Sequence, residues 1–306
     1  MGVCMLEKTL IVVLGPTGVG KTDFGIELAR HFGTEIISCD SRQIYKEMCI
    51  GTAVPSVEQL NIVPHSFIQT QSINEYYSAW QFEQQALRAI ETLHEQHDVV
   101  VMVGGSMLYI DAICQGLDDI PTINQVLRDE VHTLYIRDGL EAMQKKLGDL
   151  DPVYYEEVDL NNAKRVCHAV EVCLAAGVPY SSLRTHRMKQ RNFHILKIGL
   201  HLERKELFER LDQRVDKMLE AGLEAETLAL YPLRHLNALN TVAYKEFFDY
   251  FDGRINYDET VRLIKRNTRR YAKKQMTWFK KDADIHWFHP DDKTTINFFS
   301  KVFCGK

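Results

Sequence analysis

The sequence has few of the features that mark membrane, secreted or metal-scaffold proteins. Its longest apolar runs, such as Val99–Val103, are only a few residues long, whereas a membrane-spanning helix needs about 20. The N-terminus lacks the basic start, the apolar stretch and the small-residue cleavage site of a signal peptide. The seven cysteines are odd in number, show no C-x-x-C spacing and have no histidine at zinc spacing. We therefore expect reduced thiols, no membrane segment and a cytoplasmic protein.

Internal repeats and low-complexity tracts are also absent, and the composition is that of an ordinary globular protein. Of 306 residues, 45% are hydrophobic and 26% are charged, which excludes disorder or a coiled coil as a description of the whole chain. The length predicts one large domain or two. The net charge of −5, taken alone, argues against a nucleic-acid binder, whose domain is usually basic.

Short apolar runs alternate with amphipathic stretches in the first hundred residues. The strand-like runs lie at 9–14, 35–38, 66–69 and 99–103, and another follows at 195–202. Helical periodicity covers 22–32 and 79–94. This order predicts βαβ units and therefore an α/β fold, with a buried parallel sheet flanked by helices.

The pattern changes after residue 116, where the sequence becomes helical and more polar. The candidate helices lie at 127–135, 140–147 and 161–174, and, after the last strand-like run, near 204–221, 223–231 and 257–281. We therefore predict an α/β core formed by residues 1–116 and 193–306. A mostly helical insertion over residues 117–192 would interrupt this core.

Residues 15–22 read GPTGVGKT and fit the phosphate-binding pattern G-x-x-x-x-G-K-[ST] in full. A strand-like run precedes the pattern and a helical stretch follows it, as in a P-loop NTPase-like fold. Backbone N–H groups of such a loop surround an anion, the lysine adds a point charge, and the final hydroxyl holds Mg²⁺. The predicted diphosphate- or nucleotide-binding residues are Gly15, Pro16, Thr17, Gly18, Val19, Gly20, Lys21 and Thr22, with Thr22 as the metal ligand.

The identity of the phosphorylated ligand depends on a second feature. An ATP-using kinase or hydrolase normally has an acidic residue at the end of a second apolar strand, where it holds the metal. The best candidate strand, 99–103, is followed by Gly104, Gly105 and Ser106 instead. This absence weakens an ATPase or kinase interpretation.

A carboxylate follows the strand-like run at 35–38. Because the carboxyl ends of parallel strands face the ligand crevice, we expect Asp40 to lie near the P-loop. It could act there as a metal ligand, a general base or a helix cap. The neighbouring Arg42 and Gln43 supply donors and acceptors of the kind that read a base edge.

Taken together, these segments resemble the tRNA dimethylallyltransferase family in its short, bacterial-type form. The resemblance runs from about residue 11 to residue 281. It depends on the P-loop followed, in order, by DSRQIY (40–45), GGSMLY (104–109) and KKQMTWF (273–279). The family transfers a dimethylallyl group from dimethylallyl diphosphate to N6 of the adenine next to the anticodon, position 37, and releases diphosphate. One departure is Ala243, where the family usually has glycine before the tyrosine.

The resemblance implies a role for each site residue. Asp40 would take the proton from the adenine amine, which is a poor nucleophile because the ring shares its lone pair. Lys21, the P-loop N–H groups, Mg²⁺ on Thr22 and Arg214 would stabilise the leaving diphosphate, and Ser106 would orient the reacting groups. The implied catalytic residues are therefore Asp40, Ser106 and Arg214.

The resemblance also implies how tRNA would bind. RNA would enter a channel in the α/β core from one side and dimethylallyl diphosphate from the other, while the insertion would grip the anticodon stem-loop. The implied tRNA-binding residues are Asp40, Ser41, Arg42, Gln43, Lys164, Arg165, His168, Tyr244 and Lys245. The resemblance further implies a monomer that uses Mg²⁺.

The charge distribution supports an RNA substrate independently. Residues 261–281 carry nine Lys or Arg and no acid, so the net charge of −5 combines +9 on this segment with −14 on the remainder. Such asymmetry indicates a surface that faces a polyanion. The net charge of the whole chain therefore does not exclude RNA.

Three alternatives remain open. A prenyltransferase that acts on free adenine nucleotide would need neither the insertion nor the basic segment. An ATP-dependent small-molecule kinase lacks its expected acid after 99–103. A non-enzymatic RNA-binding protein is disfavoured by the intact Lys21, Thr22 and Asp40.

Overall fold

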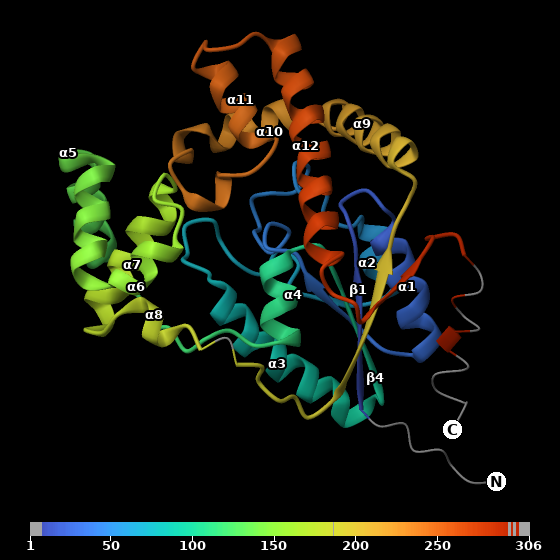
Figure 1. The fold of residues 1–306 in the computed structure, drawn as a ribbon. Coiled ribbons are helices and arrows are strands. Elements are labelled where there is room, and N and C mark those ends of the chain that lie inside the picture. The colour runs from blue at the N-terminus through green and yellow to red at the C-terminus, as the bar shows by residue number, and fades with distance from the viewer. Residues whose placement is uncertain (1–7, 186, 293–294, 296–297, 300–306) are drawn as a thin grey trace. The chain divides into compact units, whose positions relative to one another are not determined.

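The structure is a computed structural model that describes residues 8–185, 187–292, 295, 298 and 299 (Figure 1). The chain divides into two compact units. The larger consists of Met1–Cys114 and Gln190–Lys306, and the smaller is Gln115–Lys189. These bounds lie within a few residues of the core and insertion that we predicted from the sequence.

The larger unit is built on one six-stranded sheet in which every pair of neighbouring strands is parallel. Its order is β3-β2-β4-β1-β5-β6, and its strands are β1 (Thr9–Leu14), β2 (Ile36–Cys39), β3 (His65–Ser66), β4 (Val99–Gly104), β5 (His194–Leu200) and β6 (Ile285–Phe288). Gly104 of β4 pairs with Leu14 of β1 on one side and with Cys39 of β2 on the other. The three central strands therefore end at a common edge, where α/β proteins bind their ligands. The predicted α/β class is confirmed.

Helices complete the larger unit. They are α1 (Lys21–Phe32), α2 (Val57–Ile62), α3 (Ala79–Gln96), α4 (Met107–Cys114), α9 (Arg204–Glu220), α10 (Leu223–Leu230), α11 (Tyr244–Phe251) and α12 (Tyr257–Phe279), with short 3₁₀ turns at Tyr231–Leu233 and Asn237–Leu239. Among the described residues, none of the helices combines the length and the apolar character that crossing a membrane requires.

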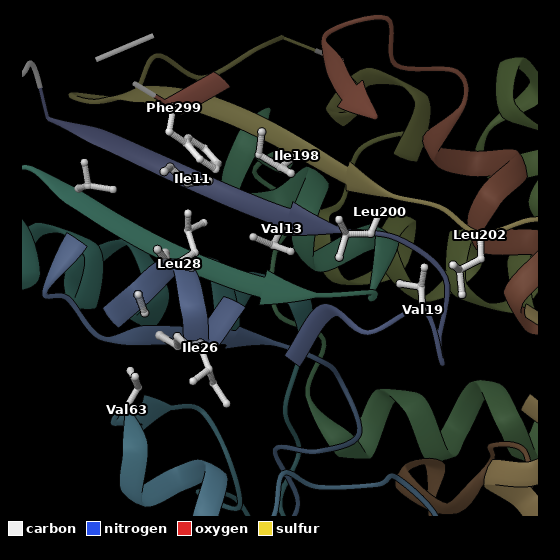
Figure 2. Packing of buried hydrophobic residues seen from close by; sticks show 14 of the residues in the cluster. Ile11, Val13, Val19, Ile26, Leu28, Val63, Ile198, Leu200, Leu202 and Phe299 are labelled. Carbon is white, nitrogen blue, oxygen red and sulfur yellow. The ribbon is translucent and has the colours of Figure 1, made fainter. Parts of the chain in front are cut away.

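Successive residues of β1 face two different apolar layers. Ile11 and Val13 belong to the layer that contains Leu28 of α1 (Figure 2). Leu10 and Val12 belong to the layer formed with α3 and α4. Because side chains alternate across a strand and both faces are buried, the strand is apolar at every position from Leu10 to Leu14. Each fully buried aliphatic side chain of this kind stabilises the fold by about 1.5–3 kcal/mol.

The smaller unit has its own core. Its helices are α5 (Gln125–Leu150), α6 (Pro152–Glu157), α7 (Ala163–Ala176) and α8 (Tyr180–Leu183), which enclose Met143, Leu147 and Val166. The two helices predicted at 127–135 and 140–147 lie within α5, which is interrupted at Gly139 (φ 77°). At the base of the unit, the Lys189 N–H donates to the Gln115 carbonyl at 2.8 Å, so the unit begins and ends at neighbouring points.

The structure corrects part of the predicted secondary structure. The strand predicted at 66–69 is wrong beyond Ser66, because Phe67 and Gln69 have φ values of 65° and 51°, outside the extended region. The helices α2, α4 and α11 and the strand β6 were not predicted. Helix α4 has the sequence MLYIDAIC, in which apolar residues are too continuous to show helical periodicity.

Candidate active site

The P-loop connects β1 to α1 at the common edge of the sheet. It turns sharply at Gly15, whose φ of 148° and close approach to the Leu200 carbonyl both require glycine, since an added Cβ would lie 2.6 Å from that oxygen. Helix α1 begins directly after the loop, at Lys21. The strand–loop–helix context predicted for residues 15–22 is therefore confirmed, and the N-terminus of α1 suits an anion.

Lys21 is held against its own loop. Its Nζ donates to the Gly15 carbonyl at 3.0 Å and to the Pro16 carbonyl at 2.8 Å. The side chain is half-buried and borders a cavity. This burial, with the nearby positive charge of Arg214, lowers the pKa of Lys21 to about 7, against a smaller opposing effect of Asp40.

A cavity of about 1020 Å³ opens beside the P-loop. The P-loop contributes Thr17, Lys21 and Thr22 to its wall, and Arg214 of α9 faces the same space. Thr22 stands in the first turn of α1 and lines the same cavity. Of the predicted phosphate-binding residues, Thr17, Gly18, Gly20, Lys21 and Thr22 line the same cavity as Arg214, whereas Val19 is buried in the core.

Asp40 follows β2 at this edge. Its Oδ1 accepts the N–H groups of Arg42 (2.8 Å) and Gln43 (3.2 Å), which fixes the carboxylate relative to the backbone. Its Oδ2 has no hydrogen-bond partner among the residues that the structure describes. One oxygen is therefore held and the other is available to a ligand.

A second cavity of about 520 Å³ meets the first at Asp40. Five residues line both cavities, namely Thr17, Asp40, Thr52, Arg214 and Tyr271. The second cavity continues between α9, α11 and α12, past Lys245 and Asn267. Two reactants could therefore reach the carboxylate from different sides, as a channel requires.

The residues after Asp40 are fixed by backbone contacts. Arg42 donates through Nη1 to the carbonyls of Asn237 (3.2 Å) and Ala238 (2.9 Å). Gln43 donates through Nε2 to the carbonyls of Thr52 (3.1 Å) and Ala53 (2.9 Å), so its Oε1 is the atom left for a base. Both residues border a cavity, Arg42 the second and Gln43 the first.

Ser106 acts on the site indirectly in this structure. It is buried, its Oγ accepts the Ser41 N–H at 2.8 Å, and it lies 3.1 Å from the Ser41 hydroxyl. Ser41, rather than Ser106, borders the second cavity. This geometry makes Ser106 a positioning residue for the segment that carries Asp40.

The end of β4 explains why no acid follows it. A Cβ on Gly104 would lie 2.0 Å from the Cys39 carbonyl, so neighbouring strands leave no room for a side chain. In the part of the chain that the structure describes, no three His, Cys, Asp or Glu side chains gather as a metal site. The packing of β4 against β2 therefore excludes any side chain, a carboxylate included, at the last residue of β4.

The remaining predicted tRNA-binding residues occupy three settings. Tyr244 is completely buried, and its hydroxyl donates to Glu226 at 2.6 Å, so its side chain offers RNA no surface in this structure. Lys245 borders the second cavity. Lys164, Arg165 and His168 are exposed on α7 of the smaller unit.

Two residues that hold the site were missed from the sequence. Glu226 accepts the N–H groups of Cys49, Ile50 and Gly51 at 2.7–3.0 Å and thereby fixes the loop that borders both cavities. Gln275 of α12 is buried, accepts the Thr17 N–H at 2.9 Å and donates to the Gly105 carbonyl at 2.8 Å. It therefore ties the P-loop to the loop after β4. The signal for Gln275 was its place in KKQMTWF, to which we assigned no role.

Ala243, which stands where the family usually has glycine, has a strained backbone conformation. Its φ of 77° lies in a region that glycine adopts freely and that strains a residue with a Cβ. It is buried, and its N–H donates to Glu246 at 2.8 Å. Ala243 therefore holds a conformation that glycine would adopt without strain.

An all-parallel sheet with a complete P-loop at its carboxyl edge defines a P-loop NTPase-like protein. The chain matches the IPP transferase family over residues 43–282. It is 53% identical over 291 residues to tRNA dimethylallyltransferase 2 of Porphyromonas gingivalis, covering 95% of this chain and 97% of that one. It is 52% identical to tRNA dimethylallyltransferase 2 of Parabacteroides distasonis, covering 94% and 97%.

Solved structures agree with these relatives. The full-length tRNA isopentenylpyrophosphate transferase of Bacillus halodurans superposes with a TM-score of 0.69 at 34% identity, covering 98% of this chain and 96% of that one. A eukaryotic dimethylallyltransferase acting on tRNA gives 0.79 at 26% identity, covering 97% and 78%. The chain therefore belongs to the IPP transferase family.

Proposed function

We propose that this protein transfers a dimethylallyl group from dimethylallyl diphosphate to N6 of adenine 37, next to the anticodon of tRNA, and releases diphosphate. Relatives at more than 50% identity are named tRNA dimethylallyltransferases. The observation that carries the detailed assignment is the free oxygen of Asp40. It stands where the P-loop cavity meets a second cavity large enough for a base.

On the acceptor side, Asp40 would remove one proton. The lone pair on N6 is delocalised into the ring, so the amine becomes nucleophilic only as its proton leaves. The bonds to Oδ1 orient the carboxylate, and Oδ2 accepts the proton. The adenine must first leave the stack of the anticodon loop, at a cost of a few kcal/mol, to enter the second cavity.

On the donor side, the N6 lone pair forms the bond to the allylic carbon while the carbon–oxygen bond to diphosphate breaks. The electron pair of the broken bond stays on the diphosphate, which becomes more negative. Lys21, Arg214 and the P-loop N–H groups face the cavity where that charge develops. Preorganised donors of this kind stabilise a transition state because they need no reorientation during the reaction.

The site fits Mg²⁺ as the expected cofactor. Thr22 would supply one protein ligand, and the diphosphate oxygens and water would supply the others, a set that this ion commonly has. When bound, Mg²⁺ adds positive charge beside the leaving group. Because one chain lines both cavities, we also propose that the enzyme works as a monomer, in the cytoplasm with its tRNA substrate.

A transfer assay tests the proposal. The protein is incubated with Mg²⁺ and labelled dimethylallyl diphosphate, and with either an anticodon stem-loop or AMP. We expect label on the RNA. Label on AMP alone would contradict the proposal and favour the free-nucleotide enzyme, and ATP-dependent phosphorylation without prenyl transfer would favour a kinase.

The variant Asp40→Asn tests the role of the carboxylate in the same assay. Asparagine retains the acceptor for the two backbone N–H groups but cannot take the proton, so we expect the rate to fall about 10²- to 10⁴-fold while RNA binding persists. Asp98→Asn is the control, because Asp98 lies at the other end of the sheet and pairs with Lys8. Near-normal turnover by Asp40→Asn would exclude Asp40 as the base.

A further inference from the structure

The carboxylate of Glu226, on α10, binds three successive backbone N–H groups of one loop. One carboxylate oxygen accepts the N–H groups of Cys49 (3.0 Å) and Ile50 (2.7 Å), and the other accepts the N–H of Gly51 (2.9 Å). Successive N–H groups that converge on one anion form a nest. In the part of the chain that the structure describes, the residues lining the two cavities at Asp40 do not include Glu226. Its effect on the reaction must therefore pass through other residues.

A fourth bond to Glu226 comes from Tyr244. The tyrosine hydroxyl donates at 2.6 Å to the same oxygen that accepts the Gly51 N–H. Burial, and then the negative charge of Glu226, raise the pKa of this hydroxyl, so it remains a donor throughout the physiological range. Glycine at position 51 permits the close packing, because a Cβ there would lie 2.6 Å from the Tyr244 ring. One carboxylate thus holds both the loop and the start of α11.

The loop held by Glu226 in turn holds Gln43. The Gln43 Nε2 donates to the carbonyls of Thr52 (3.1 Å) and Ala53 (2.9 Å), the next two residues of the loop. At the other end of the same residue, the Gln43 N–H donates to Asp40 Oδ1 at 3.2 Å. A continuous series of bonded segments therefore runs from Glu226 through the loop and Gln43 to Asp40.

Strained backbone is concentrated around this series. The described residues other than glycine that have positive φ values are Ala53 (49°), Phe67 (65°), Gln69 (51°) and Ala243 (77°). Ala53 is one of the two acceptors for Gln43, Gln69 donates its N–H to the Gln43 carbonyl at 2.9 Å, and Ala243 directly precedes Tyr244. Such conformations persist only where surrounding contacts impose them, and they gather at functional sites. The bonds to Glu226 are contacts of this kind.

We propose that Glu226 is a positioning residue for prenyl transfer, which fixes the loop at 49–53 and, through Gln43, the orientation of the Asp40 carboxylate. This inference rests on the proposed function, because it takes Asp40 as the base. A displacement of about 1 Å in a reacting group can cost about 10²-fold in rate. Loss of the Glu226 carboxylate should therefore slow the chemical step and leave the binding of dimethylallyl diphosphate unchanged.

Steady-state kinetics of Glu226→Ala test the first consequence. We expect kcat to fall about 10- to 100-fold. The KM for dimethylallyl diphosphate should not change, because Gln275, and not Glu226, ties the P-loop to its neighbour. Glu224→Ala is the matched control, from the first turn of the same helix, and should keep the wild-type kcat. A wild-type kcat in Glu226→Ala, or a KM for dimethylallyl diphosphate that rises together with the KM for tRNA, would overturn the proposal.

Chemical rescue separates positioning from a general role in folding. In Glu226→Ala the N–H groups of the nest would surround a space that fits a small carboxylate. Formate, added at constant ionic strength, should therefore restore kcat in a saturable manner. Formamide has the same shape but no charge, so it should restore less, and neither compound should change Glu224→Ala. A lowered kcat that formate does not raise would overturn the proposal.

The variant Gln43→Met tests the route from Glu226 to Asp40. Methionine removes the two side-chain bonds to the loop and keeps the backbone N–H that binds Asp40. If Glu226 acts through Gln43, adding Glu226→Ala to this variant should lower kcat by no more than about twofold. Effects that multiply in the double variant would show a different route and overturn the proposal. Glu226→Gln, which keeps the side-chain volume and one acceptor oxygen, replaces Glu226→Ala in these tests if the alanine variant does not fold.

The wild-type reaction, run alongside, separates this proposal from the proposed function. Wild-type prenylation of the anticodon stem-loop together with an unaffected Glu226→Ala would overturn only the role of Glu226. Wild-type label on AMP alone would instead overturn the proposed function.

Discussion

The lowered pKa of Lys21 predicts that binding of dimethylallyl diphosphate takes up a proton above neutral pH. In the free protein, burial and Arg214 lower this pKa to about 7, so about nine-tenths of the lysine is neutral at pH 8. The bound diphosphate is strongly negative and restores the charge on Lys21. We therefore expect an uptake of about 0.9 proton at pH 8 and about 0.1 at pH 6.

The same linkage sets the pH dependence of affinity. Below pH 7 most of the lysine is already charged, so binding needs almost no proton uptake and the affinity hardly depends on pH. Above pH 7 each bound diphosphate must first recruit a proton, and the affinity should fall by close to tenfold for each further pH unit. From pH 7 to pH 9 this amounts to a loss of about 50-fold, as long as the bound-state pKa lies above 9.

Calorimetry measures the proton directly. Titrations of the protein with dimethylallyl diphosphate at pH 8, at saturating Mg²⁺ and in buffers of different ionisation enthalpy, give the number of protons from the slope of the binding enthalpy. Lys21→Arg is the control, because arginine stays charged throughout this range and should take up no proton. An uptake that is zero in the wild type, or equal in the wild type and Lys21→Arg, would refute the assignment to Lys21.

Two further predictions concern residues that hold the site. Replacing Gln275 with methionine leaves the Thr17 N–H and the Gly105 carbonyl without partners, at a cost of about 1–3 kcal/mol, so the KM for dimethylallyl diphosphate should rise about tenfold. Steady-state kinetics should show the KM for tRNA unchanged, whereas an equal rise in both would indicate general disruption. Ala243→Gly should relieve backbone strain and raise the free energy of unfolding by about 1 kcal/mol in urea titration. Ala86→Gly, within α3, should lower it, and a loss of stability in both variants would disprove strain at Ala243.

Local patterns in the sequence predicted the parts of the site that are contiguous along the chain. The P-loop and the segment after Asp40 each lie within about ten residues, so their geometry follows from a strand, a turn and the next helix. The two helices predicted at 127–135 and 140–147 lie on either side of Gly139, where α5 is interrupted. The resemblance to a family added the order of the motifs and the identity of the substrates.

The missing parts depend on contacts between distant segments. The bond from Thr17 to Gln275 joins residues 258 positions apart, and no local periodicity reports it. Tyr244 looked available to RNA in the sequence, but the packing around Glu226 buries it. The basic segment of α12 was recognised as one block, because the acids that neutralise its first half lie mostly on α9.

The single hydrogen bond between Lys189 and Gln115 has a consequence for how such an enzyme can change over time. Because the chain departs and returns at adjacent points, a turn of a few residues would be enough to close the sheet-bearing unit without it. The conformational entropy lost on closing a loop inserted at this point grows only with the logarithm of the loop's length. Natural selection can therefore exchange, enlarge or trim the helical module as one cassette while the catalytic carboxylate and the P-loop keep their register.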